Sequence, residues 1–217
     1  MFLLAVSAVP LLAAAGIALF TPEGLFGGSP PATTTMVVKL AYLLCFATSW
    51  GATVWAVFIG GIIMFLNLPR HMMGSLRGKV FPACFALTAA CTAASAAAFA
   101  WLHLPWRAAA SPAERRQLVV LAAAAALDLA NLLVFTPRTL EVVRERHKVE
   151  RGLGLGGVGV GSFDGMRSNA RAAETCAALA TANRRFWTAH ALSVLATASS
   201  AAGLAAHSCY LAAKLAL

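Results

Sequence analysis

Hydrophobic residues gather in four long stretches, at residues 36–66, 80–104, 117–135 and 187–212. Each stretch is close to or longer than the roughly 20 residues that a helix needs to cross the hydrocarbon core of a bilayer. The pattern therefore predicts four membrane-spanning helices, joined by short links at 67–79 and 105–116 and by a long loop at 138–186. Short links make consecutive helices antiparallel, so the expected fold is all-α, an integral membrane up-down-up-down four-helix bundle.

Small and weakly polar residues recur at steps of three and four in each stretch, which places them on one face of each helix. They are Cys45, Ser49, Ala52 and Ala56; Cys84, Thr88, Cys91, Ser95, Ala98 and Leu102; Ala124, Asp128, Asn131 and Phe135; and His190, Ser193, Thr197, Ser200, Leu204 and His207. In lipid, such residues permit close backbone approach and interhelical hydrogen bonds. We therefore expect the four faces to meet inside the bundle, together with Trp50 and Trp55, and we expect Pro69, Pro82 and Pro137 to mark helix ends.

An additional hydrophobic segment, residues 1–20, precedes this domain of residues 36–217, and a linker rich in Pro and Gly at 21–35 separates the two. The segment lacks Lys and Arg, which a cleaved export signal normally carries at its start. A further membrane span or anchor is the alternative, because membrane helices tolerate a proline such as Pro10. Both interpretations stay open.

Composition and charge agree with a membrane protein and indicate its orientation. The chain is 60% hydrophobic and 12% charged, whereas soluble domains carry about 25% charged residues. Most basic residues fall within 67–79 and 138–186, so the positive-inside rule places these loops in the cytoplasm or an equivalent compartment. Acidic residues dilute the basic loop and no aromatic stacking platform accompanies it, which argues against nucleic acid as a partner despite a net charge of +9. Anionic lipid headgroups are the expected partners of Arg70, Lys79, Arg138 and Arg151. Residues 139–151 are expected to form an amphipathic helix that continues the third span and rests on these headgroups.

Asp128 is the acidic residue that the pattern places near mid-membrane. Counting along the third and fourth spans puts its carboxyl group between the hydroxyls of Ser193 and Thr197. An ionised carboxylate there costs at least about 2.5 kcal/mol, and no Lys or Arg lies at that depth, so we expect it to be neutral or wetted by an internal cavity. An acidic residue at this depth indicates either a proton- or cation-handling site or a protonated side chain that hydrogen-bonds helices together.

The histidines allow two further hypotheses. His71 and His190 belong to one end of the spans, and His103 and His207 belong to the other. A bundle could use two such pairs to ligate two haems or another metal. Capping or interfacial roles for these histidines are the alternative. The second hypothesis gathers Arg70, His71, Asn131, Arg138 and His190 into one polar cluster at the cytoplasmic end. The five cysteines form no CxxC pair, and no HExxH, GxSxG or Walker motif occurs. We therefore predict no catalytic residue, resident metal or cofactor.

Short patterns along the chain resemble a known family. They are Trp50-Gly51 with Trp55, Leu68-Pro69-Arg70-His71, Phe81-Pro82 with Phe85, Pro137-Arg138-Thr139, Glu150-Arg151-Gly152-Leu153-Gly154, and Phe186 with His190. In this order and spacing they resemble the transmembrane protein 205-like family, which implies a four-span membrane protein of unassigned activity. Asp128, His103 and His207 are departures from the family pattern.

These observations favour a non-enzymatic accessory or interaction subunit that acts through its helix faces and its basic cytoplasmic loop. Other integral membrane proteins and membrane lipids are its expected partners. Two alternatives remain: a small-solute or ion transporter that uses Asp128, and a haem- or metal-binding redox protein that uses the histidine pairs.

Overall fold

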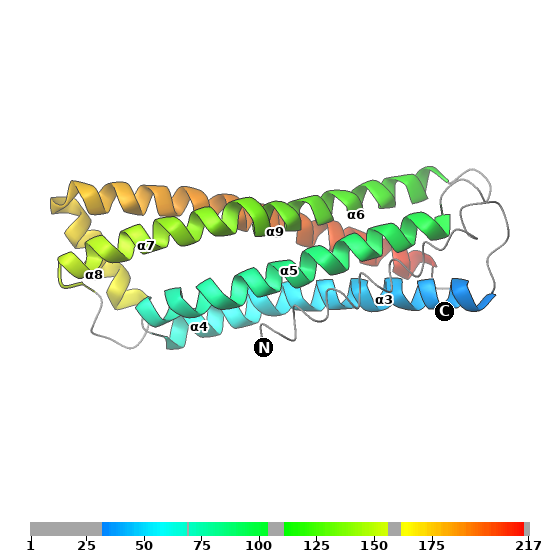
Figure 1. Ribbon diagram of the computed structural model, residues 1–217, viewed down its shortest axis with the longest axis horizontal. Coiled ribbons are helices and arrows are strands. Elements are labelled where there is room, and N and C mark those ends of the chain that lie inside the picture. The colour runs from blue at the N-terminus through cyan, green and yellow to red at the C-terminus, as the bar shows by residue number, and fades with distance from the viewer. Residues whose placement is uncertain (1–31, 69, 104–110, 156–161, 215–217) are drawn as a thin grey trace.

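The computed structural model describes residues 32–68, 70–103, 111–155 and 162–214, so the predicted segment 1–20 lies outside the described residues. The described chain forms four long helical rods and one short helix (Figure 1). The first rod joins α3 (Ala32–Val54), the π-helix η1 (Trp55–Gly60) and α4 (Gly61–Asn67). The second is α5 (Arg70–His103). The third joins α6 (Pro112–Ala130), the π-helix η3 (Asn131–Phe135) and α7 (Thr136–Gly152), and the fourth is α9 (Ala177–Lys214).

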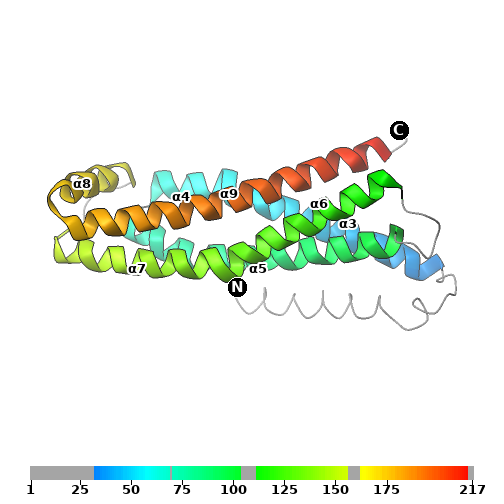
Figure 2. The same cartoon turned by 90° about the horizontal axis from the view of Figure 1, so that it is seen from above.

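The four rods confirm the predicted helical membrane bundle. The rods run up and down along one axis, and they contain helical stretches of 34, 32, 41 and 38 residues that are long and apolar enough to cross a membrane (Figure 1). A helix of 41 residues is about 62 Å long, whereas the hydrocarbon core is about 30 Å thick. The rods therefore extend well beyond the thickness that they need to cross. We call the end that holds α7, the start of α9 and the short helix α8 (Ser162–Thr175) the loop end, and the opposite end the His207 end (Figure 2).

The connections are more helical than expected. Because α5 already begins at Arg70, most of the predicted link 67–79 is helix, and the predicted loop 138–186 holds α7, α8 and the first turns of α9. Helix α7 corresponds to the amphipathic helix expected at 139–151. It continues the third rod and packs against α9 (Figure 1).

Two prolines lie inside rods instead of ending them. Pro82 lies within α5, and Pro137 is the second residue of α7, just after η3, where the amide of Thr136 donates to the carbonyl of Asn131. A π-helical turn spaces its hydrogen bonds more widely and so relieves the contact of a proline ring with the preceding turn. The third rod therefore continues through a residue that normally stops a helix.

Local signals do explain where α6 begins and where α7 ends. The Ser111 hydroxyl accepts from the amide of Glu114 at 3.2 Å, and the Glu114 carboxylate accepts from the amide of Ser111 at 2.9 Å, which completes a capping box ahead of Pro112. At the other end of the rod Gly154 adopts a left-handed conformation with φ of 67°, which glycine adopts without a steric penalty.

The helix faces expected to meet inside the bundle do so. Buried residues on these faces include Cys45, Ser49, Ala56, Thr88, Cys91, Ser95, Ala98, Ala124, Asp128, Asn131, Ser200, Leu204 and His207. Trp50 packs against the core as expected. Trp55 is 55% exposed, so its predicted interior position is wrong. Five residues advance an α-helix by about 140° around its axis, so these two rings do not share one face.

Large apolar side chains cover the outside of the first rod. Those most exposed include Met36, Leu40, Leu44, Trp55, Phe58, Ile62, Ile63 and Leu66. An apolar surface of this extent is unfavourable in water and favourable against lipid tails. Together with the four long apolar helices, it identifies a multi-pass integral membrane protein.

Two glycines of α5 allow the second and third rods to approach closely near the loop end. A Cβ atom built on Gly74 would lie 2.9 Å from Cε1 of His147, and one built on Gly78 would lie 3.1 Å from Cδ2 of Leu140. The two positions are four residues apart and form a GxxxG motif, a known signature of close helix packing in membranes. The motif is visible in the sequence, but the spacing of small residues within the four hydrophobic stretches did not identify it.

Replacing Gly74 by leucine is expected to lower the free energy of unfolding by about 1–3 kcal/mol, because the new side chain overlaps the His147 ring. Thermal unfolding in detergent measures the loss. Gly51→Leu is the matched control, since a Cβ at Gly51 meets nothing within 4 Å. Equal melting temperatures for the Gly74 variant and the control would contradict the close approach.

Candidate functional site

Polar side chains lie in layers along the interior of the bundle. Helices α6 and α9 run antiparallel and pack together, so successive turns of one helix meet successive turns of the other in reverse order. From the His207 end, the layers centre on His207, Asp128, Asn131 and Glu150, and an apolar layer lies between the first two. Each layer is described in turn, because their order determines what the interior can do chemically.

The His207 layer connects three helices through one buried imidazole. His207 of α9 is completely buried; its Nδ1–H donates to Oε1 of Gln117 on α6 at 2.9 Å, and its Nε2 accepts from the hydroxyl of Tyr42 on α3. The rings of Phe46 and Phe99 pack edge-on against it, with centroids at 5.2 and 5.4 Å. Both ring nitrogens therefore have partners within the protein.

An apolar layer follows one to two turns further along. Leu121 of α6 and Leu204 of α9 are both completely buried and pack with Phe46 and Phe99. Ser95 of α5 lies among them, but its hydroxyl donates to the carbonyl of Cys91 on its own helix at 2.9 Å. The same hydroxyl lies 3.5 Å from the carbonyl of Tyr42, which belongs to the His207 layer. Among the described residues, no hydrogen bond between two side chains joins the His207 layer to the next polar layer.

The Asp128 layer receives one polar side chain from each of the four rods. The hydroxyl of Thr92 on α5 donates to Oδ2 of Asp128 at 3.0 Å, and Ser49 of α3 lies 2.6 Å from the Thr92 oxygen. Because Thr92 gives its single hydroxyl proton to the carboxyl group, Ser49 must donate to Thr92. Ser200 of α9 approaches the same carboxyl group and is completely buried.

The Asn131 layer lies one turn closer to the loop end. Oδ1 of Asn131 accepts from the hydroxyl of Ser193 at 2.8 Å, and its Nδ2 donates to the hydroxyl of Thr197 at 3.0 Å. Asn131 thus occupies the place between these hydroxyls that the sequence analysis assigned to Asp128. The expectation was wrong by one turn, because α9 begins at Ala177 and Trp187 is not the start of the span.

Aromatic and basic groups follow on the loop-end side of Asn131. The His190 ring stacks on Phe186 with centroids 5.4 Å apart, and the Arg146 guanidinium lies 3.9 Å above the centroid of the same Phe186 ring. Arg77 of α5 donates to the carbonyl of Gly61 at 3.3 Å. These side chains close the interior where α5, α7 and α9 come together.

The Glu150 layer is a buried polar network that joins α7, α8 and α9. The carboxylate of Glu150, 2% exposed, accepts from Nδ2 of Asn169 at 2.7 Å and pairs with Arg146, one turn earlier, at 3.6 Å. Asn183 of α9 donates to Oδ1 of Asn169 at 2.6 Å. Charged groups this deeply buried are stable only when paired, so the network holds α8 against the two long helices.

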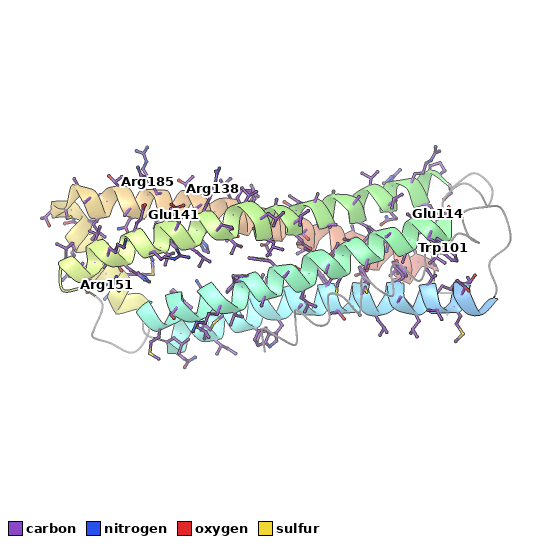
Figure 3. All side chains as sticks on the ribbon, viewed as in Figure 1. Trp101, Glu114, Arg138, Glu141, Arg151 and Arg185 are labelled. Atoms are coloured by element: carbon purple, nitrogen blue, oxygen red, sulfur yellow. The ribbon has the colours of Figure 1, made fainter. Side chains whose placement is uncertain are left out.

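Exposed basic side chains surround this buried network on the outside of the loop end. They are Arg138, Arg144, Lys148 and Arg151 of α7, Arg167 and Arg171 of α8, and Arg184 and Arg185 of α9. The exposed acids Glu141, Glu145 and Glu174 are fewer. Figure 3 shows Arg138 and Arg185 projecting away from the bundle and Arg151 at the end of α7, far from Trp101 and Glu114 at the His207 end. We call this surface of α7, α8 and the start of α9 the basic platform.

The residues of the predicted polar cluster have different surroundings. Asn131 is buried in its own layer, Arg138 is exposed, and His190 stacks on Phe186. The side chains of Arg70 and His71 lie outside the described residues, so the cluster as a whole stays a prediction. Among the predicted headgroup ligands, Lys79, Arg138 and Arg151 are exposed.

The two histidine pairs lie at opposite ends of the bundle, as expected from their positions in the predicted spans. His103 stacks on Phe99 at 4.2 Å, and its Nδ1 lies 3.0 Å from the Phe99 carbonyl. Phe99 therefore contacts both His103 and His207. Within the described residues no three His, Cys, Asp or Glu side chains converge as a set of metal ligands.

Sequence reasoning missed Gln117, Tyr42 and the whole Glu150 layer. The sequence analysis placed Arg146 and Glu150 in the amphipathic helix 139–151 without pairing them with each other, although their spacing of four residues on a helix was a detectable sign of an ion pair. Asn169 and Asn183 carried no signal of their own, because only the packing of α8 brings them together.

Comparisons with known proteins show which family and which relative the chain resembles. Residues 44–148 match a family model described as a domain of unknown function, DUF4149. Transmembrane protein 205 from Danio rerio is 29% identical over 126 residues, which cover 56% of this chain and 64% of that protein. The chain thus covers less than two thirds of the length of this relative. No solved structure matches. The matches confirm the resemblance to the transmembrane protein 205-like family.

Proposed function

We propose that this multi-pass membrane protein, similar to transmembrane protein 205, is a non-enzymatic accessory or interaction subunit. Its apolar helix faces would contact lipid and neighbouring membrane proteins, and its basic platform would bind a negatively charged surface of a partner. The basic platform is the observation that supports this proposal.

The platform has the properties of a preformed binding surface. Its three helices are held together by the buried Glu150 layer, so its exposed arginines are carried by ordered elements. Binding to a preformed surface costs less conformational entropy than binding to a loop that must first become ordered. Arginine is also suited to carboxylates and phosphates, because its guanidinium presents several donors in a fixed plane.

The basic residues of the platform lie at different distances from the apolar part of the rods, which suggests that they bind different partners. Arg138 lies close to the apolar part of the third rod, whereas Arg167 and Arg171 belong to α8 at the far end (Figure 1). We propose that Arg138 and Lys79 contact anionic lipid headgroups and that α8 contacts the acidic partner. Both interactions gain from the excess of positive charge at this end.

Reversing two charges on α8 tests the proposal. Arg167→Glu/Arg171→Glu changes exposed residues four apart, outside the Glu150 layer. We expect the wild-type protein to migrate with a larger membrane complex in mild detergent, and we expect the α8 variant to migrate alone. Native electrophoresis and mass spectrometry of the purified complex provide the measurement.

Arg115→Glu/Arg116→Glu is the matched control, because these exposed arginines give the same charge change at the His207 end. This control variant should stay in the complex. Loss of the complex from both variants would show that net charge alone matters. A wild-type protein that always migrates alone in native membranes would overturn the proposed role.

A further inference from the structure

The Asp128 layer is the strongest candidate for a second function, which goes beyond the proposed role in assembly. Asp128 is 3% exposed, and each of the four rods contributes an oxygen atom to its surroundings, through Ser49, Thr92, Ser200 and Asp128 itself. A purely structural hydrogen bond between two helices needs only two such groups. Here Thr92 and Ser200 approach the carboxyl group directly and Ser49 reaches it through Thr92, and this larger set needs an explanation.

The hydrogen bonds around Asp128 assign a donor to every contact of the carboxyl group except the contact with Ser200. Thr92 donates to Oδ2, and Ser49 donates in turn to Thr92. Ser200 faces the carboxyl group from α9, and its fully buried hydroxyl has no other partner within the described residues. Buried hydroxyls are normally satisfied, so Ser200 and the carboxyl group share one hydrogen bond, which either the hydroxyl or a protonated carboxyl group can donate.

The charges around the site indicate which cation fits. No Lys or Arg among the described residues pairs with Asp128, and the titratable group that faces it from α5 is Cys84. The neighbouring side chains from α3 and α9 are the hydroxyls of Ser49 and Ser200. A proton on the carboxyl oxygen that Thr92 leaves free would neutralise the charge and donate to Ser200, and would satisfy both groups together.

The neighbouring layers differ in their ability to conduct that proton. On the side of the loop end, the next turn holds Asn131 with Ser193 and Thr197, and His190 lies one turn beyond Ser193. On the other side, the layer of Leu121 and Leu204 holds one hydroxyl, that of Ser95, which is engaged with backbone carbonyls and forms no hydrogen bond with the Asp128 layer among the described residues. Protons move along chains of hydrogen-bonding groups and water and do not cross packed hydrocarbon.

We propose that Asp128 is an exchangeable proton-binding site within the membrane, and that it gains and loses its proton from the loop end through the Asn131 layer. The exchange is a simple protonation: the carboxylate takes a proton from water and returns it, and no covalent bond is rearranged. His190, Arg77 and Arg146 lie at the entrance to this route.

Infrared spectroscopy of the full-length protein in lipid nanodiscs tests the site directly. A protonated carboxyl group absorbs separately from a carboxylate. We expect a band of a buried carboxylic acid that weakens reversibly as pH rises and that is absent from Asp128→Asn. The asparagine variant should fold, because its amide accepts from Thr92 and donates to Ser200. Glu150→Gln is the control for the other deeply buried acid and should retain the band.

The route is tested by the rate at which this band shifts after transfer to heavy water. Asn131→Leu blocks the layer on the side of the loop end and should slow the shift several-fold, whereas Gln117→Leu at the other end should leave the rate unchanged. A band that is absent or constant across the whole pH range in which the protein stays folded would overturn the proposal. So would a band that responds to sodium at fixed pH, or a rate that Gln117→Leu slows and Asn131→Leu does not.

Discussion

Replacing Glu150 by leucine is expected to lower the free energy of unfolding by about 3–5 kcal/mol, since it removes one partner of a buried ion pair. Arg146, 7% exposed, would keep its charge without the carboxylate at 3.6 Å, and Asn169 would lose the acceptor at 2.7 Å. The loss should appear first at the loop end, because α8 is attached to α7 through this carboxylate. Limited proteolysis and thermal unfolding in detergent measure both effects.

Glu145→Leu provides the comparison. Glu145 pairs with Arg185 at 3.8 Å, but both side chains are half or more exposed to solvent. Exposed pairs contribute about 0–1 kcal/mol, so this variant should unfold almost as the wild type does. If the two variants unfolded alike, the Glu150 layer would not be a buried network.

Replacing His207 by phenylalanine is the second change with a large expected effect. The ring would still fill the space among Phe46, Phe99 and Tyr210, but the Tyr42 hydroxyl and Oε1 of Gln117 would lose their partner. Each buried polar group left without a hydrogen bond costs about 1–3 kcal/mol. We expect a marked fall in the thermal midpoint.

Tyr42→Phe separates the contributions of hydrogen bonding and packing. It removes only the hydroxyl that donates to His207, so it should cost less than His207→Phe and leave the Gln117 bond intact. Thermal melts of both variants in the same detergent give the order. A His207→Phe protein as stable as the wild type would mean that packing alone holds this end together.

The interior faces were predictable because membrane helices have few means of association. Without a hydrophobic drive between helices in lipid, small and hydroxyl-bearing residues must line the contacts, and their spacing of three and four is visible in the sequence. Thr88, Ser95 and Ser200 are buried for this reason. The same rule identified Asp128 as an interior residue.

Helix ends and layer register were less predictable, because they depend on tertiary structure. A proline such as Pro137 usually ends a helix, but the π-helix η3 accommodates it. Trp187 resembles an interfacial anchor, although α9 starts ten residues earlier. The error shifted Asp128 by one turn relative to Ser193. The Glu150 layer depends on how α8 folds back, which no local pattern records.

The apolar layer of Leu121, Leu204, Phe46 and Phe99 also has an electrical consequence. A membrane voltage falls mainly across the least polarisable part of its path, and here that part lies between Asp128 and the His207 end. Moving a unit charge through the full potential is worth about 2.3 kcal/mol per 100 mV. A proton that reaches Asp128 from the loop end does not cross this layer, so an applied voltage should alter its occupancy less than a route through the whole bundle would.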